Sequence, residues 1–317
     1  MAERRRWRNI FAEKGFISDV KAPHLGRVQR AGDSRLRTRP RHLVAQLGSP
    51  PGVPCTDWRP DSAVLGAGTA PYCSATCWHT DIDVVIDLVV LEDTDAYRTL
   101  EENLKKIGFE RGENDKGQKV NWRWKVRMDA GTTIILELLA DHPDLRGGRA
   151  QPIPNEGQIS ALNIPHSSIV FDLYDTAQVT AELLGSNGLA TETIKHANIV
   201  SFTGLKAIAY NDRQERKDAH DLVYCLEHVP QTLTEVAAMF QNGLNGKHRD
   251  VLFHSLTLLR SRFATDANAE GHLKDGPVSV AKFELGEDDD TREARALRQR
   301  EAANVIESLL NGIDTKE

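Results

Sequence analysis

The expected fold is decided by one apolar stretch, Thr80-Asp81-Ile82-Asp83-Val84-Val85-Ile86-Asp87-Leu88-Val89-Val90, which carries carboxylates at alternate positions near its start. Successive side chains of a β-strand point to opposite faces, so Asp81 and Asp83 share a face, and Ile82 and Val84 share the other. Two carboxylates held a few ångström apart repel each other unless a cation lies between them. Mg²⁺ that carries the phosphates of a nucleotide is the usual reason for such a pair. An edge strand with acidic residues in water is the alternative.

The composition is that of a soluble protein. The chain has 317 residues, of which 40% are hydrophobic and 27% are charged, and this length allows two domains or one domain with large appendages. It contains no run of about 18 uncharged apolar residues, so we expect no membrane span. The basic N-terminus leads into no hydrophobic segment of signal-peptide length, and we therefore expect a cytoplasmic protein.

The four cysteines, Cys55, Cys73, Cys77 and Cys225, are too few in a chain of this length to form a disulfide scaffold. Cys73, Cys77 and His79 lie close enough in sequence to suggest a zinc site. A fourth ligand at finger-like spacing is missing, however, which makes zinc the less favoured interpretation.

The net charge of −6 hides an asymmetry along the chain. Residues 1–42 hold 12 Lys or Arg and 4 Asp or Glu, a balance of +8, whereas the remainder holds 28 basic and 42 acidic residues, a balance of −14. A basic arm on an acidic body can bind nucleic acid, because lysine and arginine neutralise phosphates without regard to sequence. It can also lack any such role.

Residues 1–62 are predicted to be disordered or poorly folded. The segment 21–61 is rich in Arg, Pro, Gly and Ser, and no helical or strand period persists in it except over 42–47. Translation in a shifted reading frame would also give an arginine- and proline-rich stretch that changes abruptly to patterned sequence. One sequence does not distinguish the two.

Patterned sequence begins at 63–70, where an apolar lead-in ends in Gly66-Ala67-Gly68. Glycines in such a turn allow close backbone approach, and the backbone N–H groups can hold a phosphate. A plain turn explains the same residues. The strand at 81–91 follows and then a helix at 94–107, with Gly108 as its stop.

The next segments alternate in polarity or keep a helical period. We predict two strands over 118–128 and 132–139, joined by a turn, with Glu137 inside the second. Further elements are predicted in this order: a strand at 168–173, a short helix at 176–184 and an extended piece at 193–201. The acidic segment 284–290 is predicted to be a solvated linker.

The C-terminal part is predicted to be helical. Two helices over 203–228 are separated by a charged turn, with Lys206 on the first and Asp218 and Asp221 on the second. Further helices are predicted at 234–242, 248–265 and 291–311.

Over residues 63–230 the chain resembles the AbiEii-type nucleotidyltransferases, the toxin half of a class of bacterial toxin–antitoxin and phage-defence systems. Three features carry the resemblance: Gly66-Ala67-Gly68, Asp81-Ile82-Asp83, and the block Leu205-Lys206-Ala207-Ile208-Ala209 with Arg213 and Lys217-Asp218-Ala219-His220-Asp221-Leu222. The resemblance implies an α+β fold, with the mixed sheet and flanking helices of a DNA polymerase β-like nucleotidyltransferase and a helical C-terminal region. The expected organisation is an N-terminal segment 1–62, a nucleotidyltransferase-like domain 63–230 and a helical region 231–317.

The resemblance also implies roles for the acidic strand and the glycine turn. Asp81 and Asp83 would be catalytic and would coordinate the Mg²⁺ bound to the triphosphate of an NTP. Gly66 and Gly68 would let the backbone approach the nucleotide. Glu137 is a candidate for the third metal-binding carboxylate, which polymerase-like folds place on a neighbouring strand, and a strand glutamate facing solvent is its alternative.

The helical block completes the implied site. Lys206 would be catalytic and nucleotide-binding, by neutralising phosphates or lying near the leaving group. Asp218 would orient that lysine or act as a base for the incoming hydroxyl, and Asp221, one turn further on, would be its nucleotide-binding neighbour. The alternative for Lys206 with Asp218 is a surface salt bridge between two helices, which contributes at most about 1 kcal/mol.

The expected function is therefore a Mg²⁺-dependent transfer of a nucleotidyl group from an NTP to an RNA, such as tRNA, or to a protein, with a cognate antitoxin as a further expected partner. The segment 70–77 between the glycines and Asp81 lacks the helix that the family has there. A catalytically inactive relative that binds a nucleotide or a partner is therefore the alternative. A nucleic-acid-binding protein that acts through the basic arm is a third interpretation.

Overall fold

The computed structural model describes residues 44–47, 81–87, 100–127, 133–153, 159–182 and 189–314, and of 44–47, 81, 181–182, 189–190 and 192 it describes the backbone alone. The chain divides into two compact units, which are treated separately. Of the described residues, those within 44–47, 81–171 and 175–196 belong to the sheet unit, and those within 172–174 and 197–314 belong to the helical unit. Most of the predicted N-terminal segment lies outside the described residues, as do Gly66, Gly68 and the cysteines of the suggested zinc site.

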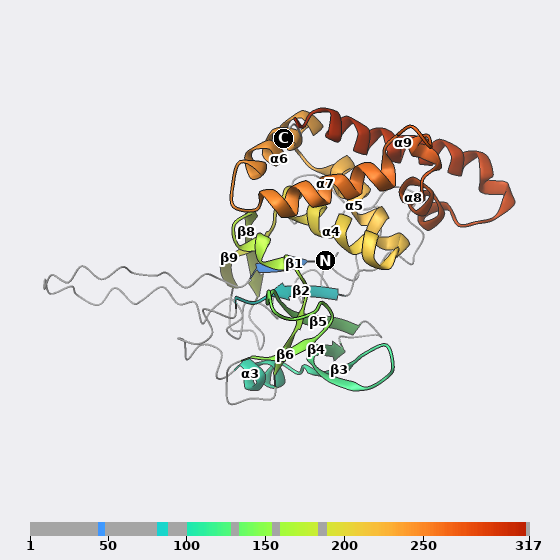
Figure 1. Ribbon diagram of the computed structural model, residues 1–317. Helices are drawn as coiled ribbons and strands as arrows, with labels where there is room; N and C mark the ends of the chain where they lie inside the picture. The colour runs from blue at the N-terminus through green and yellow to red at the C-terminus, as the bar shows by residue number, and fades with distance from the viewer. Residues whose placement is uncertain are drawn as a thin grey trace, which may run out of the picture. The chain divides into compact units, whose positions relative to one another are not determined.

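The sheet unit is built on one mixed β-sheet (Figure 1). The described strands are β1 (Val44–Leu47), β2 (Asp81–Val85), β3 (Glu110–Glu113), β4 (Lys119–Arg127), β5 (Thr133–Ala140), β6 (Ala150–Pro152), β7 (Ser160–Asn163), β8 (Tyr174–Glu182) and β9 (Leu189–Ala197). Their order along the sheet is β3-β4-β5-β2-β1-β9-β8, with β7 paired to β5 and β6 paired to β7. Strand β2 therefore lies inside the sheet, parallel to β5 and antiparallel to β1.

The two faces of the central strands differ as the alternation of the sequence predicts. Ile82 and Val84 of β2 are buried, as is Trp124 of β4, and they join a hydrophobic core that includes Leu104 of helix α3 (Leu100–Lys106). Helix α3 therefore covers this face. The opposite face carries the partly exposed polar positions of β2, β4 and β5, and Asp83 is one of them.

Several predicted elements of the sheet unit are confirmed. Strands β4 and β5 match the predicted strands at 118–128 and 132–139, and β2 lies within the predicted 81–91. Helix α3 falls within the predicted 94–107, and Gly108, which has a positive φ of 92°, lies two residues beyond its last residue, Lys106. Strand β1 coincides with the only periodic stretch of the N-terminal segment.

Two predictions in the middle of the chain are wrong. The predicted strand at 168–173 is largely the 3₁₀ helix η3 (Ser167–Phe171), and the described part of the predicted helix at 176–184, residues 176–182, belongs to strand β8. In β8 the buried Ala177 alternates with exposed Thr176 and Gln178, a period of two. The extended piece predicted at 193–201 is correct up to Ala197, where β9 ends.

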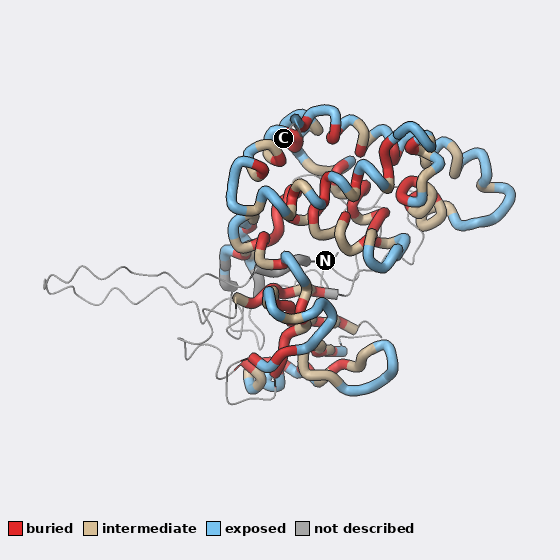
Figure 2. The backbone as a smooth tube through the Cα atoms, in the orientation of Figure 1, coloured by how far each residue is buried: buried red, intermediate tan, exposed pale blue. Residues whose placement is uncertain are grey.

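The helical unit consists of packed helices joined by short connections (Figure 1). The described helices are α4 (Ile199–Arg213), α5 (Arg216–His228), α6 (Leu233–Leu244), α7 (Arg249–Phe263), η4 (Gly271–Leu273), α8 (Asp275–Leu285), η5 (Asp289–Thr291) and α9 (Arg292–Asn311). Figure 2 shows buried positions recurring along these helices, which is the pattern of amphipathic helices around a shared core. The predicted pair over 203–228 and the predicted helices at 234–242, 248–265 and 291–311 are confirmed.

Local sequence signals explain where these helices begin. The Asn198 side chain caps α4 by accepting from the N–H groups of Val200 and Ser201. A capping box starts α6: Thr232 Oγ1 accepts from the Glu235 N–H at 3.3 Å, and Glu235 Oε2 accepts from the Thr232 N–H at 2.7 Å.

Helix α8 was not predicted from the sequence. Its last turn contains Glu284, which the sequence analysis assigned to a solvated acidic linker, and this assignment is wrong for Glu284 and Leu285. The side chain of Glu284 is only 17% exposed and is ion-paired. Residue Gly286, with a φ of 73°, ends the helix.

The fold is thus α+β, with a mixed sheet and a helical region. Helices α4 and α5, which hold the predicted Lys206 block, belong to the same compact unit as the C-terminal helices. The predicted boundary between 230 and 231 stays a prediction. In the part of the chain that the structure describes, no helix is both long enough and apolar enough to cross a bilayer.

Candidate functional site

Asp83 and Glu137 are paired across the centre of the sheet. In the parallel pairing of β2 with β5 they occupy the same register position, so their side chains leave the sheet on the same face. Neighbouring strands lie about 4.8 Å apart, which brings the two carboxyl groups into reach of one cation. This arrangement is what the sequence analysis expected of a third carboxylate on a neighbouring strand. The side chain of Asp81 lies outside the described residues, and its backbone pairs with Ile135.

Arg123 on β4 extends this row of polar side chains. It is the register partner of Glu137 on the other side of β5, and its Nε donates to Glu137 Oε1 at 2.6 Å. A second donor of the guanidinium, Nη1, binds the carbonyl oxygen of Glu113 at 2.9 Å. The guanidinium also lies over the ring of Trp122, 4.8 Å from its centroid. Glu137 is therefore held in a fixed, charge-neutralised position and does not simply face solvent.

A glycine makes room for this arginine. A Cβ atom added to Gly112 on β3 would lie 2.9 Å from Arg123 Cγ and 3.2 Å from its carbonyl oxygen. Any larger residue at position 112 would push the arginine side chain or the strand out of place. The glycine on β3 thus helps to position Arg123 against Glu137.

A second charged cluster lies at the edge of the same sheet. Glu113 accepts from Lys125 Nζ at 2.7 Å and lies 2.6 Å from Lys119 Nζ. Hydrogen bonds from the two lysines lower the pKa of Glu113 to about 2, so it is ionised at neutral pH. Lys119 and Lys125 are therefore both engaged by one carboxylate.

Asp83 and Glu137 match the hard oxygen ligands that Mg²⁺ prefers. Glu137 is the weaker candidate of the two because Arg123 already neutralises it. Among the described side chains, which do not include that of Asp81, no three His, Cys, Asp or Glu residues are grouped as a metal site. The donor set fits the ion only if Asp81 supplies the remaining carboxylate.

The predicted residues of the helical unit also come together. Lys206 on α4 places its Nζ 3.0 Å from Asp218 Oδ1 and 3.0 Å from Asp221 Oδ2, both on α5. Arg213, at the end of α4, binds Asp218 in a bidentate manner, with Nε–Oδ2 at 2.6 Å and Nη2–Oδ1 at 2.8 Å. Two cations and two carboxylates thus form one network that joins the helices on both sides of the turn at Gln214.

This network is buried and differs from the surface salt bridge that was the sequence-based alternative. The side chain of Asp218 is 2% exposed and that of Lys206 is 18% exposed. Burial alone would lower the pKa of Lys206, but the charges of Asp221 and Asp218 outweigh it and raise that pKa above its usual value. Burial would likewise raise the pKa of Asp218, but Arg213 and Lys206 hold it below its usual range. Lys206 and Asp218 are therefore both charged at neutral pH.

Cys225 lies one turn beyond Asp221 on α5. Burial, together with the negative charge of Asp221, raises the pKa of its thiol to about 12. The thiol stays protonated at neutral pH and is unsuited to act as a nucleophile or metal ligand.

A third network, which was not predicted from the sequence, links α5, α8 and α9. Arg298 binds Glu284 at 2.7 Å and Glu227 at 2.7 Å, and His220 Nδ1 lies 3.0 Å from Glu284 Oε1. The ring of His220 also lies against that of Phe283, tilted by 31° and with 4.6 Å between ring centroids. No local sequence pattern indicates these pairs, because their members are 14 to 71 residues apart.

The structure therefore brings together Asp83 with Glu137 in one unit, and Lys206 with Asp218 and Asp221 in the other. Gly66 and Gly68 lie outside the described residues, so their predicted role stays a prediction. Arg123 also belongs to the candidate site of the sheet, and it was not predicted from the sequence. The alternation of β4 placed it on the polar face, but its partner depends on strand register, which the sequence did not reveal.

Comparisons with protein-family models, with curated proteins and with solved structures gave no match.

Proposed function

We propose that this protein is a Mg²⁺-dependent nucleotidyltransferase that moves a nucleotidyl group from an NTP to an RNA or protein acceptor. The observation that carries the proposal is the register pairing of Asp83 with Glu137 on the polar face of two parallel strands. The Asp-x-Asp pattern of β2 and the resemblance to AbiEii-type nucleotidyltransferases, including their polymerase β-like fold, support it. The cognate antitoxin of a toxin–antitoxin or phage-defence system belongs to the same proposal.

The chain's own residues divide the work. Asp83, together with Asp81, would hold the metal, and Glu137 would complete the carboxylate set from the neighbouring strand. Bound Mg²⁺ supplies positive charge where negative charge develops on the phosphate oxygens. Arg123 binds Glu137 through its Nε–Oε1 bond, so the metal would have to share that carboxylate with the arginine. Catalysis of nucleotidyl transfer depends mainly on the positioning of the reactants and on charge stabilisation, and a rigid sheet can provide both.

The Lys206 network supports a positioning role within the same proposal. Its two cations are matched by two carboxylates, so the network offers little net positive charge to a triphosphate. Asp218 accepts from Lys206 Nζ at 3.0 Å. This contact is consistent with the first of the two roles expected of Asp218, which is to orient the lysine. The third proton of the ammonium is the one through which Lys206 would bind a phosphate oxygen.

A catalytically inactive relative that binds a nucleotide or a partner is the second candidate. The salt bridge between Arg123 and Glu137 favours it, because an arginine there occupies a carboxylate that a catalytic metal would use. This candidate predicts nucleotide binding without turnover.

The test is incubation of the purified chain with each of the four NTPs, radiolabelled on the α-phosphate, with Mg²⁺ and total RNA. The Asp81→Asn/Asp83→Asn double variant is run beside it. Label found on RNA or on protein with the wild type alone supports the proposal and identifies the acceptor class. Binding of NTP by the folded wild type with no transfer to either acceptor would favour the second candidate.

A further inference from the structure

Three of the described strands, β3, β6 and β8, each pair with only one other described strand. Two of these edge strands carry features that hinder pairing with another chain. Strand β3 has four residues, of which Glu110, Arg111 and Glu113 are charged, and β6 has three residues and ends in Pro152. Short length, charge and proline are the usual protection of a sheet edge.

Strand β8 lacks this protection along most of its length. It has nine residues, Tyr174–Glu182, and lies at the end of the strand order, next to β9. Its segment 176–181 reads Thr-Ala-Gln-Val-Thr-Ala, with no charged residue, proline or glycine. A long, uncharged edge strand offers its backbone N–H and C=O groups to a further strand.

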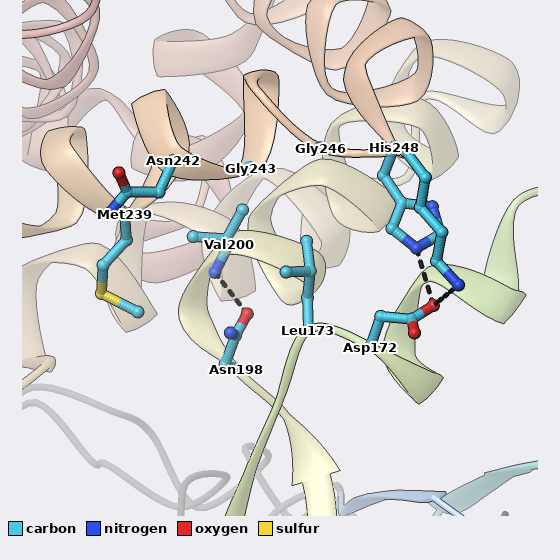
Figure 3. A pocket seen from close by; sticks show the side chains of 10 residues that line it. Asp172, Leu173, Asn198, Val200, Met239, Asn242, Gly243, Gly246 and His248 are labelled. Carbon is cyan, nitrogen blue, oxygen red and sulfur yellow. Dashed lines mark hydrogen bonds and ion pairs between the residues drawn. The ribbon is translucent and has the colours of Figure 1, made fainter.

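Two contacts give the register of β8 against β9. Thr180 Oγ1 lies 2.8 Å from Thr191 Oγ1. The Leu173 carbonyl oxygen accepts from the Asn198 N–H at 3.2 Å, and Figure 3 shows these two residues side by side. Because residues 183–188 are too few for a crossover connection, the strands run antiparallel. Both contacts then fit one register, in which Thr180 lies opposite Thr191 and Leu173 lies opposite Asn198.

This register determines which backbone groups of β8 face the open edge. In an antiparallel pair, the N–H and C=O groups of successive residues point alternately toward the partner strand and away from it. The Leu173 carbonyl points toward the β9 side, so the groups of Ala177 and Val179 do the same. The groups of Thr176 and Gln178 therefore point away from β9, to the edge.

The side chains of β8 alternate between an apolar and a polar face. Ala177 is buried, and Val179 packs against the hydrophobic core of the sheet unit. Thr176 and Gln178 are exposed. A strand added at this edge would therefore extend both faces if its own side chains alternated in the same way.

We propose that two copies of this chain associate through β8, in an antiparallel pairing centred on Gln178. In this register Gln178 lies opposite Gln178 of the second copy, and Thr176 lies opposite Thr180 of the second copy. The edge-facing backbone groups of the two strands then meet along the whole of β8. Ala177 lies opposite Val179 of the second copy, so the apolar face continues from one copy to the next.

The distribution of charge agrees with this self-pairing. The two acidic residues of β8, Asp175 and Glu182, stand near its ends. In the register centred on Gln178, Asp175 lies opposite position 181, an alanine, and Glu182 lies opposite position 174, a tyrosine. No two like charges are therefore directly opposed. Because each copy has one β8, the pairing closes as a two-fold dimer and does not continue into a fibre.

Cysteine substitutions test the register. Residues directly opposite each other in a hydrogen-bonded antiparallel pair have Cα atoms about 5.5 Å apart, which a disulfide can span. We expect Gln178→Cys to link two copies on mild oxidation, seen as a dimer band on a non-reducing gel. Thr176→Cys is the matched control, because its two copies would lie about 13 Å apart along the strands. Linking by Gln178→Cys no stronger than that of the wild type, or equal linking by both variants, would overturn the proposal.

A proline substitution tests the association itself. Sedimentation equilibrium of the full chain from about 1 to about 200 µM should show a monomer–dimer equilibrium, because one pair of strands makes a small and hence weak interface. Gln178→Pro removes an edge-facing N–H and leaves the bonds to β9, so it should weaken the dimer at least about tenfold. Gln178→Thr keeps that N–H and should match the wild type within about twofold.

Circular dichroism and thermal unfolding check that both variants are folded. A wild type that is monomeric over the whole range would overturn the proposal and leave the edge to a strand of another protein. A dimer that Gln178→Pro does not weaken would place the interface elsewhere. Neither outcome bears on the proposed nucleotidyl transfer, which uses no residue of β8.

Discussion

Lys206 Nζ lies 3.0 Å from Oδ1 of Asp218, a residue twelve positions further along the chain and on the next helix. The same ammonium is bound by Asp221, and the same carboxylate is bound by Arg213. The residues of this family-like motif thus form one network, in which two cations are matched by two carboxylates. Its stability and its chemistry can be tested separately.

Substitution of Asp218 by asparagine is expected to destabilise the helical unit strongly. The change leaves Lys206 with one carboxylate fewer and removes the acceptor of the bidentate Arg213 bond, and breaking a buried ion pair costs about 3–5 kcal/mol. Urea unfolding monitored by circular dichroism measures the loss. Asp212→Asn, which changes an exposed carboxylate in the last turn of α4, is the control and should change the free energy of unfolding by less than about 0.5 kcal/mol. Equal effects of the two variants would show that the network does not stabilise the fold.

Glu284 is expected to make stability depend on pH in acid. Burial would raise its pKa, but His220 and Arg298 outweigh this and lower the pKa from 4.5 to about 2. A carboxylate whose pKa is lower in the folded state stabilises it fully above pH 4.5, and that contribution is lost as the pH falls toward about 2. The shift corresponds to at most about 3 kcal/mol.

The Glu284→Gln variant isolates this contribution. The wild type should exceed the variant in free energy of unfolding at pH 6, and the difference should shrink as the pH approaches 3, measured by urea unfolding at each pH. A difference that stays constant across that window would contradict the assignment.

Packing of the helical core is tested by glycine substitutions. A Cβ atom at Gly276 would lie 2.7 Å from three atoms of the Phe263 ring, whereas one at Gly204 would lie 3.4 Å from Ser255 Oγ. We expect Gly276→Ala to lower the free energy of unfolding by about 1–3 kcal/mol. We expect Gly204→Ala, in the interior of α4, to be near neutral because alanine favours a helix by up to about 1 kcal/mol. Thermal unfolding of the two variants compares them, and the reverse order would contradict the packing.

Arg123 offers a test of the sheet site that does not require turnover. If Glu137 is a metal ligand, Arg123→Gln removes the cation that competes for it, and Mn²⁺ should bind about tenfold more tightly, as measured by electron paramagnetic resonance. Lys125→Gln, on the same face but paired to Glu113, is the matched control and should leave Mn²⁺ affinity unchanged. Weaker binding in the Arg123 variant would assign Arg123 a purely structural role.

Strong periodic signals predicted most of the elements correctly. Strand β4 alternates Trp124 and Val126 with Arg123 and Lys125, so its existence and its two faces could be predicted from sequence. The helices of the C-terminal part were equally clear, with the exception of α8. Errors occurred where the apolar run was short, as at Ser167–Phe171, since such a run is compatible with a strand and with a helical turn.

Apart from Arg123, the residues of the candidate site could be predicted from the sequence, but the contacts between them could not. The proximity of Asp83 to Glu137 depends on the register of β2 against β5, and the bond from Arg123 depends on the register of β4. Single-sequence patterns indicate which face a strand residue takes and leave its neighbour on the next strand undetermined. The pairing of Glu284 with Arg298 could not be predicted either, because it depends on the tertiary packing of their two helices, α8 and α9.

The central claim is that Asp83 belongs to a metal-dependent nucleotide site, and Mg²⁺-dependent NTP binding tests it most directly. Binding of each NTP is measured by equilibrium dialysis with Mg²⁺ and with chelator, for wild type, Asp83→Asn and Asp144→Asn. The last variant removes an exposed carboxylate of the same unit. The account predicts that one or more NTPs bind the wild type and Asp144→Asn only when Mg²⁺ is present, and that Asp83→Asn, shown to be folded by circular dichroism, loses this binding. Binding that is unchanged in Asp83→Asn, or absent from the wild type with every NTP, would contradict it.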